Sequence, residues 1–377
     1  MEARCTSRKN PRVVTLPDEL VAEILARVPF RSLCQLRCVS QSWRSLCSDP
    51  AVLRRCPQTL AGFFFRTRPH RRSRSVRQFV NASGRGPPMV NPSLSFMPPV
   101  YSRASFLDSC NGLLLCRRDD IQSQVDAYFV CNPATENWMV LPDLQVTKRR
   151  FSFRAFRLGF DPAVSSHFRV FVLESDPRPP KTWDHLMTGV EIFSSETRAW
   201  SYRQSEWDGG NGAVVGWDSL FFNGILHLTS PGSSSLLTMD MDGRAWGRIL
   251  TPHDFDFMGV SQGRLHAVHR TKNGGDECIS IWVLEDYAGQ QWTLKHAVTA
   301  MQMFGARIRS FGNSCTFIVR ALHPEHGLIF LTAGRLRSLL AYDMDKKEVR
   351  FIWNLGENHI FAQAYVPCFS DWLSDGR

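Results

Sequence analysis

Residues 221–246 read FFNGILHLTSPGSSSLLTMDMDGRAW, and this stretch contains the pattern that decides the fold. Asn223-Gly224 stands between two apolar pairs, which is the strongest short-range sequence signal for a β-hairpin. A second apolar run follows and meets a polar turn that ends at Trp246. The stretch therefore predicts two consecutive hairpins, or four short antiparallel strands.

The same two elements recur along the chain, which makes the repeat the main evidence for the fold. A polar turn followed by tryptophan ends at Trp138, Trp200, Trp246 and Trp292, and a fifth copy without the aromatic ends at Val349. A turn glycine followed by apolar residues stands at Gly112, Gly224, Gly263 and Gly327. A four-stranded sheet of about 45 to 60 residues cannot bury both of its faces alone, and radial stacking of such sheets gives a β-propeller. The repeat favours that fold over a β-sandwich with irregular hairpins.

The repeat accounts for five units. Residues 58–106 and the strand-like residues 359–369 could contribute another, closing the ring with strands from both ends of the chain. Ten of the 11 tryptophans follow residue 110, and we expect most of them to fill the space between neighbouring sheets.

Residues 15–56 read TLPDELVAEILARVPFRSLCQLRCVSQSWRSLCSDPAVLRRC and predict a run of short helices. Thr15 is expected to cap the first helix, which ends at Pro29, Ser32 to cap the second, and Asp49-Pro50 to begin a fourth. A unit of about 40 residues seldom buries enough surface to fold stably alone. Its surplus of apolar residues either covers a partner or packs on the rest of the chain.

This helical segment resembles the F-box, position by position over the whole motif. The matching residues are Leu16-Pro17-x-x-Leu20-x-x-x-Ile24-Leu25-x-x-Val28-Pro29-x-x-Ser32-Leu33-x-x-x-Arg37-x-Val39-Ser40-x-x-Trp43-Arg44-x-Leu46. Val28 stands where leucine is usual, and Gln41 where lysine is common. The resemblance implies docking on the Skp adaptor of an SCF (Skp-cullin-F-box) ubiquitin ligase. The positions that match the family's docking surface are Leu16, Pro17, Leu20, Ile24, Leu25, Val28, Leu33 and Val39, while Trp43 and Leu46 are expected to hold the helices together.

The β region resembles, over roughly residues 106–367, the F-box-associated domain that follows the F-box in large plant families. The segments that carry the resemblance are Gly159–Pro162, Phe221–His227, Ser261–His266 and Ile281–Tyr287. Double glycines occur only at 209-210 and 274-275, so the glycine pairs of true kelch repeats are absent. In that family the domain is taken to hold the protein to be ubiquitinated, here called the client. The family has no shared client motif, so no client-binding residue can be named.

The net charge of +10, from 45 basic and 35 acidic residues, belongs to one end of the chain. Residues 1–110 hold 18 basic and 6 acidic side chains, whereas residues 111–377 hold 27 and 29. Seven arginines fall in one acid-free stretch, namely Arg66, Arg68, Arg71, Arg72, Arg74, Arg77 and Arg85. Because only Phe79 is available there for stacking on bases, we predict a solvated linker. An acidic protein partner, a nuclear import signal and direct binding of nucleic acid are the alternatives.

Other motifs resemble catalytic or metal-binding patterns, but the residues around them do not support those roles. Gly259–Gly263 satisfies the G-x-S-x-G pattern of hydrolases, yet a helix must follow such a serine, and residues 264–269 alternate as a strand does. The histidine pairs His266 with His269 and His323 with His326 have a spacing that could bind a metal ion on a helix, but they fall in predicted strands and turns. We therefore predict no catalytic residue, no metal site and no cofactor.

The cellular compartment is inferred from what the sequence lacks. Residues 1–14 contain no apolar run suited to a signal peptide, and no stretch reaches the length of a membrane span. The 11 cysteines include no Cys-x-x-Cys pair, which indicates reduced thiols. We expect a soluble, unsecreted protein of the nucleus and/or cytoplasm, with the sequon Asn81-Ala82-Ser83 unglycosylated.

The sequence thus predicts a small all-α F-box followed by a large all-β domain, favoured as a β-propeller. The expected divisions are 1–14 (disordered), 15–56 (F-box), 57–105 (Arg-rich linker, which could supply a strand or blade), 106–370 (propeller) and 371–377 (tail). The implied function is that of a non-catalytic substrate-recognition subunit, with cullin and RING subunits as partners through the adaptor. A nucleic-acid-binding protein that uses Arg66–Arg85, or a propeller enzyme, is the alternative.

Overall fold

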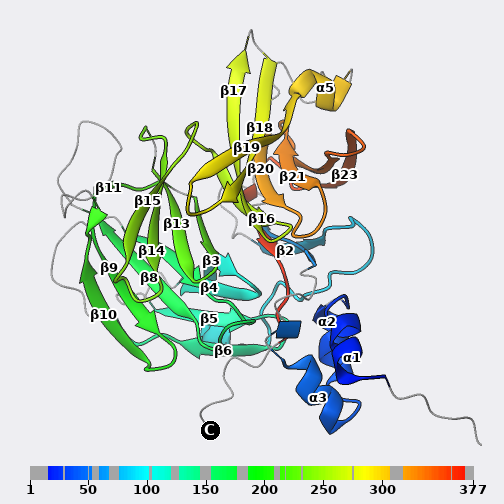
Figure 1. Ribbon diagram of the computed structural model, residues 1–377, viewed down its shortest axis with the longest axis vertical. Helices are drawn as coiled ribbons and strands as arrows, with labels where there is room; N and C mark the ends of the chain where they lie inside the picture. Colours follow the sequence, from blue (N-terminus) through cyan, green and yellow to red (C-terminus); the bar gives the residue numbers. More distant parts are fainter. Residues whose placement is uncertain are drawn as a thin grey trace, which may run out of the picture. The chain divides into compact units, whose positions relative to one another are not determined.

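The computed structural model describes residues 16–28, 30–49, 51–52, 59–67, 76–101, 104–119, 127–144, 154–175, 186–207, 213–216, 218–230, 232–273, 276–305, 317–357 and 359–369. The chain divides into two compact units, residues 1–57 and residues 58–377. The first is helical, and the second consists mainly of strands (Figure 1). Within the described residues, no helix is long and apolar enough to cross a membrane.

The described part of the helical unit contains α1 (Asp18–Leu25), α2 (Phe30–Leu36) and α3 (Gln41–Cys47). The predicted cap Thr15 lies outside the described residues, and Pro17 occupies the capping position of α1 without a side-chain hydrogen bond. Its carbonyl accepts the first helical hydrogen bonds, from the backbone N–H groups of Leu20 and Val21. The prediction that Thr15 caps this helix is therefore wrong.

The other two predicted helix starts have different outcomes. Ser32 lies inside α2, because that helix already begins at Phe30, so its predicted capping role is wrong. The Asp49 carboxylate accepts the backbone N–H of Ala51 at 2.8 Å, as a cap does, while Pro50 lies outside the described residues. An additional cap holds α3, where the Ser40 hydroxyl accepts the N–H of the third helical residue.

The described part of the second unit forms six antiparallel sheets, so the predicted all-β domain is a six-bladed propeller. Five blades contain consecutive strands in chain order. They are β3–β6 (Ala104–Cys110, Leu113–Arg118, Tyr128–Asn132, Asn137–Val140), β7–β10 (Arg154–Gly159, Arg169–Ser175, Leu186–Ser194, Ala199–Gln204), β12–β15 (Ser219–Phe222, Ile225–Ser230, Ser235–Asp240, Trp246–Leu250), β16–β19 (Phe257–Ser261, Arg264–Asn273, Asp276–Asp286, Gln291–Thr299) and β20–β23 (Phe317–Leu322, Leu328–Ala333, Ser338–Asp343, Glu348–Asn354). A short strand, β11 (Ala213–Val214), pairs with β9.

The sixth sheet, here called the closing blade, joins the two ends of the unit. Its order is β2-β1-β24, from β1 (Gly62–Thr67), β2 (Val76–Asn81) and β24 (His359–Tyr365). The innermost strands of successive blades contact one another in turn around the ring, namely β3, β7, β12, β16, β20 and, in the closing blade, β24. The expectation that both ends of the chain contribute a further blade is confirmed. Residues 57–105, predicted as an Arg-rich linker that could supply a strand or blade, supply β1 and β2.

Aromatic side chains fill the closing blade where it meets the first blade. The Phe64 ring packs edge-on against Phe79 at 4.8 Å and against Tyr365 and Phe106 at 5.2 Å each, between ring centroids. Phe64, Phe79 and Tyr365 come from all three strands of the closing blade, whereas Phe106 lies on β3. These contacts bind the first and last strands of the propeller into one core.

Tryptophans connect neighbouring blades through their ring N–H groups. Trp200 Nε1 donates to the carbonyl of Pro142 in the preceding blade at 2.9 Å, and Trp292 Nε1 donates to that of Leu250 at 3.0 Å. Trp207, which follows β10, is buried and packs edge-on against Trp246 of the next blade. The expected packing between blades is confirmed for these side chains, while Trp353 remains 48% exposed. Trp183, Trp217 and Trp372 lie outside the described residues.

The hydrogen bond from the Trp292 ring N–H group to Leu250 allows the connection between blades to be tested. Trp292→Phe removes the N–H group while retaining most of the apolar contact, and we expect the β unit to lose about 1 kcal/mol of stability. Trp353→Phe, the matched control on an exposed side chain, should change stability by less than about 0.5 kcal/mol. The measurement is urea unfolding followed by tryptophan fluorescence and circular dichroism. Equal effects of the two substitutions would contradict a connecting role for the Trp292 hydrogen bond.

Candidate partner-binding surface

The helical unit has a small core of its own. Its buried residues are Leu25, Ala26, Leu33, Cys47 and Val52, and Val21, Ala22, Leu36, Trp43 and Leu46 pack against them. These side chains come from all three helices and the residues after α3. The core therefore uses only part of the apolar surface that the sequence supplies.

Several large aliphatic side chains of this unit remain exposed. Leu16, Leu20, Ile24 and Val39 keep between 51% and 63% of their surface accessible. Leu20 and Ile24 are four residues apart on α1, so they share one face of the helix, and Leu16 precedes that face by a further four residues. We call Leu16, Leu20 and Ile24 the apolar stripe. A row of exposed aliphatic residues is characteristic of a protein–protein contact.

The eight sequence-predicted docking residues differ in how much of their surface is exposed. The apolar stripe, Pro17 and Val39 are exposed, and Val28 is half-buried. Leu25 and Leu33 lie in the core of the helical unit, so in this structure they stabilise the fold and offer no surface to a partner. Trp43 and Leu46 pack against the same core.

The hydrolase-like motif is a hairpin turn. Gln262 and Gly263 have φ angles of 53° and 68°, and positive angles at both central residues of a two-residue loop are those of a type I′ turn. The strand β17 follows at once, in place of the helix that a nucleophilic serine requires. Ser261 itself is buried. The motif therefore has a structural role, as its sequence context indicated.

The histidine pairs also have structural surroundings. Buried His266 is hydrogen-bonded through Nδ1 to the carbonyl of Arg264, and His269 instead stacks on His253 at 4.5 Å between ring centroids. His323 and His326 stack at 4.6 Å, and Nδ1 of His323 accepts the backbone N–H of His326 at 3.2 Å. Within the described residues, no group of three or more His, Cys, Asp or Glu side chains could hold a metal ion.

The arginines that the structure describes are tied into the closing blade. Arg66 on β1 donates to the Ser105 hydroxyl and, at 3.2 Å, to the Asp119 carboxylate. Arg77 on β2 donates to the carbonyl of Ser93 at 2.9 Å, and its guanidinium lies 5.7 Å from the Phe106 ring centroid. Burial lowers the pKa of Arg77.

The prediction of a solvated linker is accordingly wrong for Arg66 and Arg77. Arg85 is exposed in a turn that the sequon residue Asn81 organises, since the Asn81 amide donates to the carbonyls of Arg85 and Pro87 at 2.8 Å each. The remaining arginines of the stretch, Arg68, Arg71, Arg72 and Arg74, lie outside the described residues.

Charged side chains gather along the inner strands of the propeller. The partly buried Asp108 carboxylate on β3 accepts the backbone N–H groups of Ser109 and Leu158 at 2.8 Å each. Burial raises the pKa of Asp108, and nearby Arg157 on β7 opposes that shift. Burial likewise raises the pKa of Asp218, against the opposing charge of Arg157. These groups join neighbouring blades electrostatically and show no arrangement of nucleophile and base.

Comparison with known proteins gives a consistent result for both units. Residues 14–55 match the family described as F-box domain, and residues 61–365 match the F-box associated beta propeller domain. F-box protein At1g30790 of Arabidopsis thaliana is 24% identical over 320 residues, which cover 76% of this chain and 75% of that protein. F-box protein At5g49610 of the same plant is 24% identical over 311 residues, which cover 77% of this chain and 80% of that protein.

Among solved structures, TolB from Acinetobacter baumannii is similar over 81% of this chain and 66% of that one, with 12% identity and a TM-score of 0.42. This likeness is too low to bear on function.

Buried His227 on β13 makes the stability of the β unit depend on pH. Burial lowers its pKa from 6.5 to about 4, and its Nε2 lies 3.0 Å from the Tyr287 hydroxyl. Below pH 6.5 the unfolded chain therefore binds a proton that the folded chain binds only near pH 4. The contribution of His227 to the free energy of unfolding is complete above pH 6.5 and is lost as the pH falls toward 4.

His227→Phe tests this dependence, because phenylalanine stands at the corresponding repeat position of the fifth blade, Phe330. We expect the variant's melting temperature to fall less steeply between pH 6.5 and 4.5 than that of the unaltered protein. Some slope will remain, since burial also lowers the pKa of His323 to about 4. Identical slopes in the two proteins would exclude His227 as the titrating group.

Proposed function

This chain belongs to the F-box proteins that carry an F-box-associated β-propeller domain, and from that premise we propose that it is the substrate-recognition subunit of an SCF-type ubiquitin ligase. In this proposal the helical unit docks on the Skp-type adaptor, which connects it to the cullin and RING subunits. The β unit binds a protein client. The proposed place of action is the nucleus and/or cytoplasm.

The apolar stripe is the observation that carries the proposal. Leu16, Leu20 and Ile24 expose about half of their surface in a unit whose own core is already formed by other residues. Fully burying one such side chain contributes about 1.5 to 3 kcal/mol. A partner groove that covers the stripe would therefore gain much of a specific binding free energy from three side chains. Exposed Val39, which follows α2, would add to the same contact.

The proposed contribution to catalysis is proximity. A receptor that holds a client beside the ubiquitin-carrying subunits raises the effective concentration of the client's lysines near the reactive thioester. This role requires two binding surfaces and no nucleophile, base or metal on the receptor itself. The buried Ser261 and the internally bonded histidines are in keeping with a non-catalytic subunit.

The alternative of a nucleic-acid-binding protein receives less support. Arg66 and Arg77, which were candidates for phosphate contacts, direct their guanidinium groups to partners within the β unit. Their hydrogen bonds would have to be exchanged for contacts with phosphate. If nucleic acid were nevertheless the ligand, its affinity would fall steeply with salt concentration.

Alanine substitution of the stripe tests the docking proposal. We expect Leu20→Ala with Ile24→Ala to weaken binding of the purified adaptor by about 100-fold or more, because the two side chains each lose burial in the complex. The helical unit should keep its fold, since both residues are half-exposed in the free protein. Binding is measured by titration calorimetry, and folding by circular dichroism.

Two further variants distinguish loss of the stripe from loss of any exposed leucine and from loss of the helical fold. Leu250→Ala, at a similarly exposed leucine of the β unit, should bind the adaptor normally. Leu25→Ala removes a buried side chain next to the stripe and should destabilise the helical unit by about 2 to 5 kcal/mol. Full adaptor binding by the Leu20/Ile24 double variant would overturn the proposal.

A further inference from the structure

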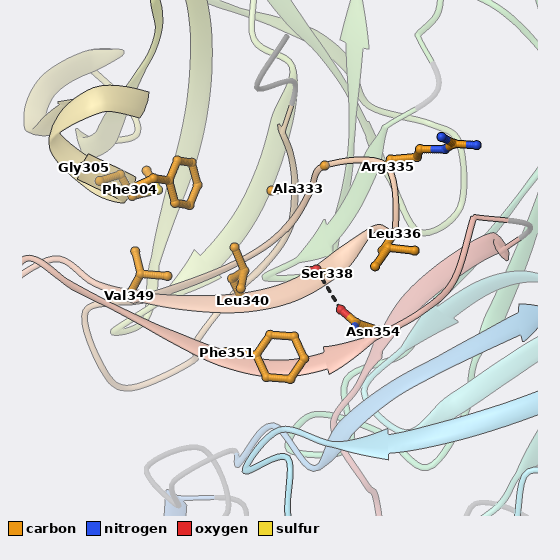
Figure 2. A pocket seen from close by; sticks show the side chains of 12 residues that line it. Phe304, Gly305, Ala333, Arg335, Leu336, Ser338, Leu340, Val349, Phe351 and Asn354 are labelled. Carbon is orange, nitrogen blue, oxygen red and sulfur yellow. Dashed lines mark hydrogen bonds between the residues drawn. The ribbon is translucent and has the colours of Figure 1, made fainter. Parts of the chain in front are cut away.

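A cavity of about 570 Å³ opens between the short helix α5 (Ala300–Phe304) and the fifth blade of the propeller. Figure 2 shows its apolar side, to which Phe304, Leu340, Val349 and Phe351 contribute side chains. The volume lies within the range of about 300 to 1,000 Å³ that is usual for ligand sites. The cavity is therefore large enough for a short stretch of peptide with a bulky side chain.

The wall formed by α5 is fixed by local hydrogen bonds. Thr299 and Gln302 form a reciprocal capping box, in which the Thr299 hydroxyl accepts the Gln302 N–H at 3.1 Å and the Gln302 carbonyl oxygen accepts the Thr299 N–H at 3.0 Å. Met303 and Phe304 are buried in the core shared by the fourth and fifth blades. The cavity is therefore already formed in the free protein, so binding would cost little reorganisation.

A β-bulge decides which side chains of β23 face this cavity. The register between β22 and β23 shifts between Leu339 and Leu340, so Phe351 pairs with Leu340 and Trp353 pairs with Leu339. Leu340 belongs to the core beside α5, whereas Leu339 belongs to the core shared with the closing blade. Phe351 and Trp353 therefore lie on opposite faces of one strand, although both are about half exposed, at 56% and 48%.

The cavity also has a polar side. Ser338 Oγ lies 2.8 Å from Asn354 Oδ1, a contact that Figure 2 marks with a dashed line. If the hydroxyl donates to that oxygen, the Asn354 amide keeps both of its N–H groups for another acceptor. An asparagine amide in this state can donate to a peptide carbonyl.

A single charged residue, Arg335, is found among the described residues that line the cavity. Its side chain is 85% exposed, and its Nε pairs with a Glu357 oxygen at 2.9 Å. In Figure 2 the Arg335 side chain extends away from the cavity. An ion pair this exposed contributes about 1 kcal/mol or less. The terminal nitrogens of Arg335 have no bond within the described residues, so they can receive a carboxylate at the cavity mouth.

We propose that this cavity is the client site, and that it binds an extended peptide segment in which a large apolar side chain lies next to an aspartate or glutamate. The apolar side chain enters between Phe304 and Phe351, the Asn354 amide donates to the peptide backbone, and Arg335 pairs with the carboxylate. The proposal rests on the function proposed above, because it names the class of client segment that the β unit holds.

The exposed apolar rim favours a peptide as the occupant. Leu336, at the turn between β21 and β22, is half-exposed beside the mouth, as is Phe351. A small ligand held inside the cavity would cover only the parts of these two side chains that line it, and would leave their outer parts in water. A peptide that continues past the mouth would cover both, and its carboxylate would match the one cationic group there.

The test is selection from a random-peptide display library against the full chain, followed by affinity measurement with synthetic peptides. We expect the selected peptides to share a large apolar residue with a neighbouring acid. Replacing that acid by its amide counterpart should weaken binding by about ten-fold, and Arg335→Glu should remove this preference. Phe351→Asp and Leu336→Asp should each weaken binding by about ten-fold or more.

Trp353→Ser is the matched control, because it alters an equally exposed aromatic on the opposite face of the same strand. It should change peptide affinity by less than about two-fold. All variants are first compared by thermal unfolding, and Leu336→Asp, which lies in a turn, remains informative if Phe351→Asp unfolds. Peptides that bind Phe351→Asp and Leu336→Asp as well as the unaltered chain would overturn the proposal.

The remaining outcomes are equally decisive. Failure to enrich any peptide, enrichment of peptides without the acid, or binding only of small aromatic carboxylic acids would each contradict a peptide client of this class. The docking function is tested separately, because Leu20→Ala with Ile24→Ala should abolish adaptor binding while leaving peptide affinity unchanged. If Phe351→Asp also lost adaptor binding, the chain would be misfolded. A lowered melting temperature of the variant would reveal this misfolding.

Discussion

The antiparallel pairing of β24 with β1 is the interaction on which the β unit depends, because it alone converts a row of sheets into a ring. Bringing together strands that are about 300 residues apart costs roughly 5 kcal/mol of chain entropy. The ladder from Gly62 to Thr67 and the edge-on contacts of Phe64 with Phe79 and Tyr365 offset this cost. Every inner strand then has a neighbour on each side, so the contacts between blades, including the Trp200 and Trp292 hydrogen bonds, hold one fixed geometry.

Five of the six blades could be predicted from the sequence, because each repeats a polar turn at similar spacing and four of them also carry a hairpin glycine. The closing blade could be suspected only from strand-like residues at the two ends. Its arginines suggested a solvated linker, since charge next to proline and glycine is typical of loops. What the sequence does not show is that Asp119, far along the chain, approaches Arg66, or that Phe106 lies beneath Arg77. Long-range partners made these charges compatible with strands.

The candidate surfaces were predictable to different extents. On α1 the i, i+4 spacing of Leu20 and Ile24 defines a face, but the adjacent Leu25 points about 100° away and belongs to the core. A list of apolar motif positions does not show which of them lie on the exposed face and which in the core, because that depends on how the helix is rotated about its axis. On β23, strict alternation would place Phe351 and Trp353 on one face, and the bulge opposite Leu339 and Leu340 separates them. A one-residue shift in register, invisible in composition, thus decides that Phe351 and not Trp353 faces the cavity beside α5.

Both units leave large apolar side chains exposed, and the two cases differ in kind. The apolar stripe projects from α1 and the residues just before it, and the complement that we propose for it is a groove on the adaptor. The cavity beside α5 is concave, and side chains on its rim can vary without disturbing the β1–β24 ladder, because that ladder lies on the far side of the core built around Leu339. Recognition specificity can therefore change at Leu336, Arg335 or Phe351 while the closure that holds the ring stays intact. Arg66 and Arg77, the described arginines of β1 and β2, belong to neither surface, since they are bonded within the closing blade and its neighbours.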